Sequence, residues 1–331
     1  GQKEEAAGQG VQGCGSGGMK SRQIKAIFAA LGLLIVAYVA VQMLSGKGPA
    51  AGSDGIAESV RDGFRTVRVL TPDPADSVRL EEADGAWTVN GYPADSSMVR
   101  ELAEGLDSAR VGRLVARSAT NHARLGVSDD SARRIEIGPV GNPSIMFLMG
   151  RVGTDGRFVR FPPSDDVFTV SAASMRPLGR SAEEWRDRVV ASVDTSIVTR
   201  IAIRRNDQPA PVLLAKTGGS EEAPAWSLDG QAVDSIFVNA LLQESAELLA
   251  IGFPSDSLAF SVDFSSPVAV LEMFDSTGPG AAPALSLLFL TAPDAPEFLV
   301  RRADNALVYR ISAAQAEWLL PTRAMLLGSV E

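Results

Sequence analysis

Histidine and cysteine are nearly absent from this chain, whose 331 residues include one of each. The cysteine, Cys14, lies close to the N-terminus, and the histidine is His122. Nucleophilic triads are commonly built around a histidine, and zinc sites draw mainly on histidine and cysteine. The composition therefore excludes disulfides and cysteine metal sites downstream of Cys14, and it leaves any triad dependent on His122.

Short catalytic motifs are missing as well. Neither GxxxxGKS/T nor GxSxG occurs, so the sequence offers no P-loop and no nucleophile elbow. Residues 8–13 match GxGxxG, but that pattern binds a pyrophosphate only between a strand and a helix, and no strand precedes it. The adjacent acids Asp129-Asp130 and Asp165-Asp166 stand in turn-like surroundings, where aspartate also serves as a turn former. With His122 expected in a solvated loop, we assign no catalytic, cofactor-binding or metal-binding residue.

Basic residues are outnumbered by acidic ones. The chain has 31 Lys and Arg against 40 Asp and Glu. Residues 1–47 hold five of the basic and two of the acidic residues, which leaves 26 basic and 38 acidic residues and a net charge near −12 for the rest. Such a surface repels phosphate backbones, so we expect no nucleic-acid partner.

A long uncharged run stands near the N-terminus, from Ala26 to Leu44. As a helix its 19 residues would span about 28 Å, close to the hydrocarbon thickness of a bilayer. Lys20, Arg22 and Lys25 precede the run, and the positive-inside rule then places the N-terminus in the cytoplasm. The sequence predicts a single-pass inner-membrane protein whose C-terminal part is extracytoplasmic.

A cleaved signal peptide is the alternative to an anchor. Its apolar region is usually shorter, and a small-residue cleavage site must follow it directly. Gln42, Met43 and Leu44 stand at that place, and Pro49-Ala50-Ala51-Gly52 is the nearest substitute. We therefore expect the helix to be retained.

The predicted organisation of the N-terminal region follows from this anchor. Met19 has the setting of a natural start, so residues 1–18 are expected to be a disordered extension or a misassigned start. Residues 19–25 form the cytoplasmic basic segment and residues 26–44 the transmembrane helix. A small-residue linker over residues 45–60 precedes the globular part.

An internal repeat organises that globular part. The stretch from Trp87 to Glu101 resembles the stretch from Trp226 to Ala240, with a constant offset of 139 residues. Each copy has a Trp, a Gly four residues later and an Asp-Ser pair before an apolar helical pattern. Repeats of this kind indicate one supersecondary unit used twice. We predict tandem modules at residues 61–190 and 191–331.

Each copy predicts the same order of elements. Period-two strands joined by short turns come first, then a helix capped by Asp95 or Ser96 in one copy and by Asp234 in the other. The predicted apolar stripes of these helices are Val99, Leu102, Leu106 and Leu114, and Phe237, Leu241 and Leu248. Four strands follow each helix. Strands joined by hairpin-length turns favour antiparallel sheets with helices on one face, so the fold class is α+β.

Two aligned residue pairs allow alternative interpretations. Trp87 and Trp226 occupy equivalent positions, as repeated packing residues or as a paired aromatic platform for a glycan. Arg188 and Arg323 also align, and each is expected to pair with a local carboxylate.

The chain resembles a known family at these motifs. Leu125-Gly126-Val127 before a strand pair, and Trp185-Arg186-Asp187-Arg188 before an Ile-Ala-Ile strand, are similar to motifs of the bacterial DUF4340 family of membrane-anchored proteins of unknown function. The resemblance covers about residues 65–325. It carries over no catalytic residue, and it implies an accessory role beside ABC-type transport or gliding-motility components.

We therefore expect a non-catalytic extracytoplasmic binding or scaffold protein, an accessory subunit of a membrane assembly for transport, motility or export. One alternative is a binder of cell-envelope polymer, which would need an aromatic and polar groove between the modules. Another is an envelope hydrolase, which would need converging carboxylates, or His122, in a pocket.

Overall fold

The computed structural model describes residues 55–139, 141–219, 224–276, 280–293 and 296–328. The predicted transmembrane helix at 26–44 and the segments before it lie outside the described residues. Within the described ranges, no helix is long and apolar enough to cross a membrane. Residues 55–60, which the sequence assigns to the linker, form helix α2 (Gly55–Val60), in which Ile56 is fully buried and which packs on α3 (Ser96–Asp107).

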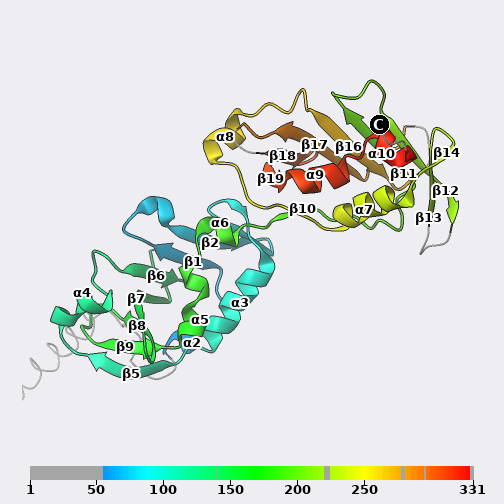
Figure 1. The fold of residues 1–331 in the computed structure, drawn as a ribbon. Coiled ribbons are helices and arrows are strands. Elements are labelled where there is room, and N and C mark those ends of the chain that lie inside the picture. Colours follow the sequence, from blue (N-terminus) through cyan, green and yellow to red (C-terminus); the bar gives the residue numbers. More distant parts are fainter. Residues whose placement is uncertain (1–54, 140, 220–223, 277–279, 294–295, 329–331) are drawn as a thin grey trace, which may run out of the picture.

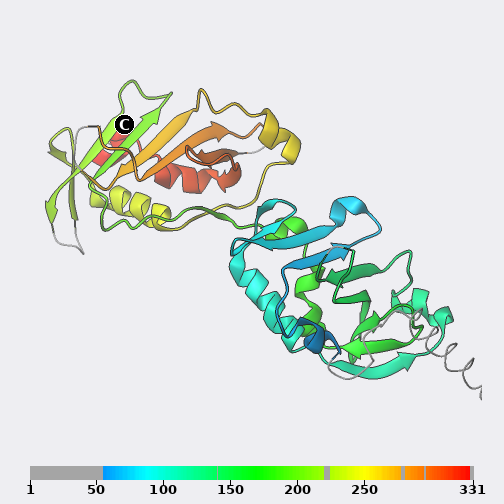
Figure 2. The same ribbon diagram turned by 180° about the vertical axis from the view of Figure 1, so that it is seen from behind.

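The described residues form two large antiparallel sheets and one small one, with helices packed on them, so the fold is α+β (Figures 1 and 2). The N-terminal sheet has nine strands in the order β4-β3-β2-β1-β6-β7-β8-β9-β5. Its strands are β1 (Thr66–Leu70), β2 (Val78–Ala83), β3 (Ala86–Val89), β4 (Tyr92–Pro93), β5 (Val111–Ala116), β6 (Arg133–Ile137), β7 (Ile145–Gly153), β8 (Gly156–Arg160) and β9 (Val167–Val170).

The C-terminal sheet has eight strands in the order β14-β13-β12-β11-β16-β17-β18-β19. Apart from β5, the two sheets have equivalent strand orders, in which each strand of the N-terminal sheet corresponds to the strand numbered ten higher in the C-terminal sheet. Its strands are β11 (Arg200–Arg205), β12 (Val212–Gly219), β13 (Pro224–Leu228), β14 (Gln231–Ala232), β16 (Ala269–Phe274), β17 (Leu285–Thr291), β18 (Glu297–Arg302) and β19 (Tyr309–Ser312). The small sheet pairs β10 (Val189–Ala191) with β15 (Leu248–Leu249) and lies where the chain passes from one large sheet to the other.

Three hairpins have two-residue turns with positive φ at both positions. These turns are Asp84-Gly85, Asn90-Gly91 and Asp229-Gly230, with φ between 48° and 88°. This geometry matches the right-handed twist of the flanking strands, and Asn-Gly and Asp-Gly are the pairs that adopt it at least cost. Local sequence thus fixes the registers of β2 with β3, β3 with β4 and β13 with β14.

The long helices begin where the sequence predicts. Asp95 caps α3 (Ser96–Asp107) and Asp234 caps α7 (Ser235–Ala246), each accepting from a backbone N–H two residues later. Two predicted stripe positions are wrong. Leu114 lies in strand β5, and Leu248 lies in β15, because α7 ends at Ala246 and the chain then becomes extended.

Shorter helices complete the elements. They are η1 (Pro74–Asp76), η2 (Ala119–Asn121), α4 (His122–Leu125), α5 (Ala172–Met175), η3 (Pro177–Gly179), α6 (Ala182–Trp185), α8 (Asp256–Ser261), α9 (Ala313–Leu319) and α10 (Arg323–Leu327). Leu125-Gly126-Val127 ends α4, since Gly126 is left-handed with φ of 75° and the Val127 N–H donates to the His122 carbonyl.

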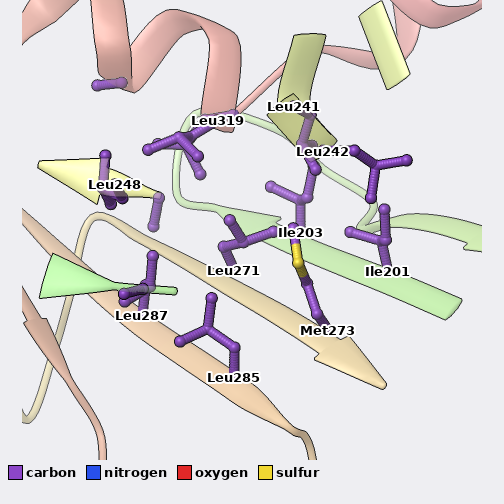
Figure 3. Packing of buried hydrophobic residues seen from close by; sticks show 14 of the residues in the cluster. Ile201, Ile203, Leu241, Leu242, Leu248, Leu271, Met273, Leu285, Leu287 and Leu319 are labelled. Carbon is purple, nitrogen blue, oxygen red and sulfur yellow. The ribbon is translucent and has the colours of Figure 1, made fainter. Parts of the chain in front are cut away.

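Each large sheet has its own apolar core. In the C-terminal core, alternate residues of the central strands point toward the helices, as period-two strands require. Figure 3 shows Ile201, Ile203, Leu271, Met273, Leu285 and Leu287 from the strands facing Leu241 and Leu242 of α7 and Leu319 of α9. The N-terminal core is built likewise around Phe147, Ile135 and Leu102. Because the cores are separate, the two sheets are joined only where β10, β15 and their neighbouring residues lie between them.

Candidate functional site

The segment Trp185–Asp187 closes one edge of the N-terminal sheet. The Asp95 N–H donates to the Trp185 carbonyl at 2.9 Å, and the Asp187 N–H donates to the Pro93 carbonyl at 2.9 Å. Between these bonds Ala94 and Arg186 form a β-bridge. Trp185 is 1% exposed and belongs to the N-terminal core. The motif Trp185-Arg186-Asp187-Arg188 therefore fastens the end of that sheet.

The same segment then reaches the C-terminal sheet. The Ala250 N–H donates to the Arg188 carbonyl at 2.8 Å, and β10 pairs with β15. Residues just beyond β15 pair with β19, since the Ile251 N–H donates to the Arg310 carbonyl and the Arg310 N–H to the Gly252 carbonyl, both at 2.9 Å. Two backbone segments thus join the facing edges of both sheets.

Side chains add a second set of contacts at this junction. The Arg186 guanidinium stacks on the ring of Tyr92, 3.8 Å from its centroid, and on the ring of Phe253, 3.6 Å from its centroid. Tyr92 belongs to β4 of the N-terminal sheet, whereas Phe253 follows β15. The Tyr92 hydroxyl donates to Asp256 Oδ1 of α8 at 2.7 Å. The stacked Arg186 guanidinium and the hydrogen bond from Tyr92 to Asp256 therefore connect the two sides of the junction at one point.

Arg186 has unusual electrostatic surroundings. Its side chain forms no ion pair with any described residue, and its Nε is buried without an acceptor among them. Burial lowers the pKa of the Arg186 guanidinium, while the charges of Asp256 and Glu183 act in the opposite direction. The hydrogen bond to Asp256 raises the pKa of Tyr92, so the phenol stays protonated as the donor.

An open pocket of about 500 Å³ lies beside these contacts. Its walls come from the hairpin of β3 and β4, from the 3-10 helix η1, from α6 and Arg186, and from the segment that leads from β15 into α8. The lining residues are Ala75, Val89, Asn90, Tyr92, Ala182, Glu183, Arg186, Phe253, Pro254, Ser255 and Asp256. We take this inter-sheet pocket as the candidate site, because it combines aromatic rings, a cation and two carboxylates.

The two aligned tryptophans do not form a paired platform. Trp226 is 5% exposed and lies in the C-terminal core. Trp87 is half-buried and contacts Phe64 edge-on, with the ring centroids 5.7 Å apart. Packing therefore explains the repeated position. Each aligned arginine was expected to pair with a carboxylate. Arg323 does so with Asp229 at 2.5 Å, whereas Arg188 forms no ion pair in the described part of the chain.

His122 is not a solvated residue, and that expectation is wrong. It is 6% exposed at the start of α4, and its Nε2 lies 2.9 Å from the Asp165 carbonyl oxygen, to which it donates. The segment that holds Asp165 folds back over α4, a long-range contact that no local pattern reveals. Asp129, which belongs to the other pair of adjacent acids, forms an ion pair with the buried Arg160 at 2.6 Å. Over the ranges that the structure describes, no three metal-ligating side chains converge.

Replacing His122 by alanine is expected to lower the free energy of unfolding by about 1–3 kcal/mol, because a buried acceptor loses its donor and a cavity forms. Chemical denaturation of the purified protein measures the change. Arg124→Ala, on the exposed side of the same short helix, is the matched control and should shift stability by less than about 0.5 kcal/mol. Equal effects of the two substitutions would mean that the imidazole is not a packing residue.

Sequence reasoning missed most of the candidate site. Only Arg186 was singled out, through the motif Trp185-Arg186-Asp187-Arg188, and then without a function. Tyr92 follows a recognisable Asn90-Gly91 turn, but nothing in the sequence indicates that it would meet Phe253 and Asp256, which are more than 150 residues away along the chain.

The family model for "Domain of unknown function (DUF4340)" matches residues 87–256, just over half of the chain. The match runs from β3 to the start of α8 and so contains Tyr92, Arg186, Phe253 and Asp256. No curated protein and no solved structure matches the chain.

Proposed function

Because the chain belongs to the DUF4340 family, which carries no known activity, we propose a function from its surface and its organisation. It is a non-catalytic binding or scaffold protein of the bacterial inner membrane. Residues 26–44 anchor it as a single pass, and the folded part lies outside the cytoplasm. There it serves as an accessory subunit beside a membrane partner, such as an ABC-type transporter or a motility or export complex.

The distribution of exposed apolar side chains supports a protein partner. Among the described residues nine large hydrophobic side chains are exposed, and eight of them lie in or beyond β10. They are Val189, Ile197, Leu213, Ile236, Leu249, Ile251, Phe260 and Trp318, with Val152 alone in the N-terminal sheet. Only those that lie next to one another form a contiguous apolar patch, and such patches mark interaction sites. The partner would then contact the C-terminal half.

Helices α7 and α9 carry the clearest part of that surface, which we call the α7–α9 patch. It consists of Ile236, 66% exposed, Trp318, 41% exposed, and Phe237, whose ring lies 6.2 Å from that of Trp318. The two helices pack side by side on the C-terminal sheet. Aromatic residues are enriched in the buried centres of protein interfaces, so this patch suits a partner.

The finer domain organisation is also part of the proposal. We infer that the globular part arose by duplication of one unit, with modules at residues 61–190 and 191–331. The shared strand order and the equivalent Asp-capped helices support this inference. In such a duplication the first copy lies next to the membrane anchor, and the second copy is free to bind the protein partner.

Site-specific photocrosslinking in cells that make the protein tests this function. A photoreactive amino acid at position 236 or 318 is expected to yield a covalent adduct with one membrane protein, identified by mass spectrometry. The matched control is position 152, where Val152 is 57% exposed but lies on the other sheet, and it should give no such adduct.

The anchor supplies a second arm of this experiment. A chain without residues 20–44, redirected to the same compartment, should lose most of the adduct, because the anchor raises the local concentration beside the partner. Equal adducts from positions 152, 236 and 318, or none from any of them, would count against the scaffold function.

The pocket between the two sheets favours one alternative function, that of a binder of cell-envelope polymer, since it supplies the aromatic and polar lining that such a role requires.

A further inference from the structure

Arg186 offers hydrogen-bond donors that the protein itself leaves unused. Two rings cover the faces of its guanidinium, so any remaining partner must approach in the plane of the group. A guanidinium carries five N–H donors in that plane. No described residue accepts from them, and Nε is buried, so this one donor without an acceptor requires an explanation. A ligand in the adjoining pocket would supply the missing acceptor.

Acceptors line the same pocket. Glu183 is exposed at the pocket wall, and its carboxylate has no hydrogen-bond partner among the described residues. Asp256 uses Oδ1 to accept from the Tyr92 hydroxyl, which leaves Oδ2 available. The site therefore presents a planar donor fork together with two carboxylate acceptors, an arrangement suited to a ligand that both donates and accepts.

The rest of the lining combines the neutral polar residues Asn90 and Ser255 with apolar groups. The rings of Tyr92 and Phe253 and the side chain of Pro254 supply the apolar part of the lining. A volume of about 500 Å³ is within the range of small-molecule sites, which combine apolar walls with a few convergent polar groups. The C–H faces of a sugar ring can pack on such walls while its hydroxyls meet the polar groups.

Charge selects among the possible ligands. Glu183 and Asp256 both act on Arg186, so the site holds two negative charges against one positive charge. The chain beyond residue 47 is acidic as well, with 26 basic and 38 acidic residues. A free anion such as phosphate would be repelled by the net negative charge, whereas an uncharged polyhydroxylated ligand can pair with the donors and the acceptors without adding a charge to the site.

We propose that the inter-sheet pocket binds a sugar unit of an uncharged oligosaccharide. Arg186 donates to its hydroxyls, while Glu183 and Asp256 accept from them. Because the walls combine residues of the β3–β4 hairpin with the segment that leads into α8, a bound sugar also bridges the two sides of the junction. This binding does not involve the α7–α9 patch. A negative result for sugar binding would therefore leave the proposed protein-partner function intact, and the reverse also holds.

Isothermal titration of the full-length protein in detergent micelles tests the proposal. The probes are the tetrasaccharide of β-1,4-linked N-acetylglucosamine and maltotetraose, with inorganic phosphate as the anionic probe. At least one neutral probe is expected to bind saturably. Glu183→Gln and Asp256→Asn each replace one carboxylate oxygen by an amide nitrogen with little change of shape. Each should weaken binding by about tenfold or more, as loss of a charge-assisted hydrogen bond does.

Glu247→Gln is the matched control, since Glu247 is an exposed carboxylate at the C-terminal end of α7 and does not line the pocket. It should leave binding unchanged. Four results would overturn the proposal: no binding of either neutral probe at millimolar concentration, binding unaffected by Glu183→Gln and Asp256→Asn, binding of phosphate in preference to sugar, or cleavage of the bound probe detected by mass spectrometry.

Discussion

Replacing Arg186 by alanine is expected to release the two large sheets from their fixed relative orientation. The guanidinium contacts one ring from each side of the junction, at 3.8 and 3.6 Å from the centroids. A partly desolvated cation–π contact contributes on the order of 1–2 kcal/mol, and the substitution removes two of them. The Tyr92 hydroxyl and Asp256 would then hold the side-chain part of the junction with a single hydrogen bond.

Pulsed electron paramagnetic resonance measures this release as a distance distribution. Spin labels at Glu104→Cys on α3 and Gln243→Cys on α7, both exposed, report on the two sheets once Cys14 is replaced by serine. The parent protein should give a narrow distribution and Arg186→Ala a broad one. Melting of each core should change little, because Arg186 belongs to neither.

Two matched substitutions separate stacking from charge. Arg186→Lys keeps the charge but loses the planar group, so its distribution should resemble that of Arg186→Ala. Arg188→Ala removes an exposed arginine two residues along and should leave the distribution narrow. A narrow distribution in Arg186→Ala would mean that the backbone bonds of β10 and β15 suffice to hold the sheets.

The second large effect concerns the cores. Leu102 of α3 and Leu241 of α7 are both 0% exposed. Replacing either by alanine is expected to lower the free energy of unfolding by about 2–5 kcal/mol, since burial is lost and a cavity remains. Denaturant titration followed by tryptophan fluorescence measures the loss, with Trp87 and Trp185 reporting on the N-terminal core and Trp226 on the C-terminal core.

Ile236→Ala is the control for Leu241→Ala, because Ile236 is on the same helix but 66% exposed. It should change stability by less than about 0.5 kcal/mol. Leu102→Ala should affect mainly the transition reported by Trp87 and Trp185, and Leu241→Ala the one reported by Trp226. Small effects at both leucines would show that α3 and α7 do not cover the sheets.

Local chemistry explains which parts of the fold could be predicted. Asp95 and Asp234 act as helix caps through bonds that span only two residues, and Asn90-Gly91 turns the chain by its own backbone preference. Such features need no knowledge of the rest of the molecule. Leu114 and Leu248 were assigned to helices because apolar spacing fits more than one element, and the pairing of β5 with β9 and of β10 with β15 decided otherwise.

The candidate site could not be predicted in the same way. Tyr92, Arg186 and Phe253 meet only because the two sheets face each other at their edges, and no local spacing encodes that contact. His122 shows the same limit in a smaller form, since its burial depends on the distant segment around Asp165. The family motif contains Arg186 and so indicates where this residue stands in the chain, but it does not indicate what the side chain does.

The hydrogen bonds that join the sheets also remove their free edges. Residues 185–187 cover the end of the sheet beyond β4, and residues 250–252 cover β19. An uncovered edge offers unpaired backbone groups that can recruit a strand from another molecule, the first step of amyloid-like assembly. The outer edges are blunted as well, because β14 has only two residues, while β5 is interrupted by bulges and carries Arg113 paired with Asp155. In the described part of the chain, the sheet edges therefore offer a second copy little unpaired backbone with which to form a new strand pair.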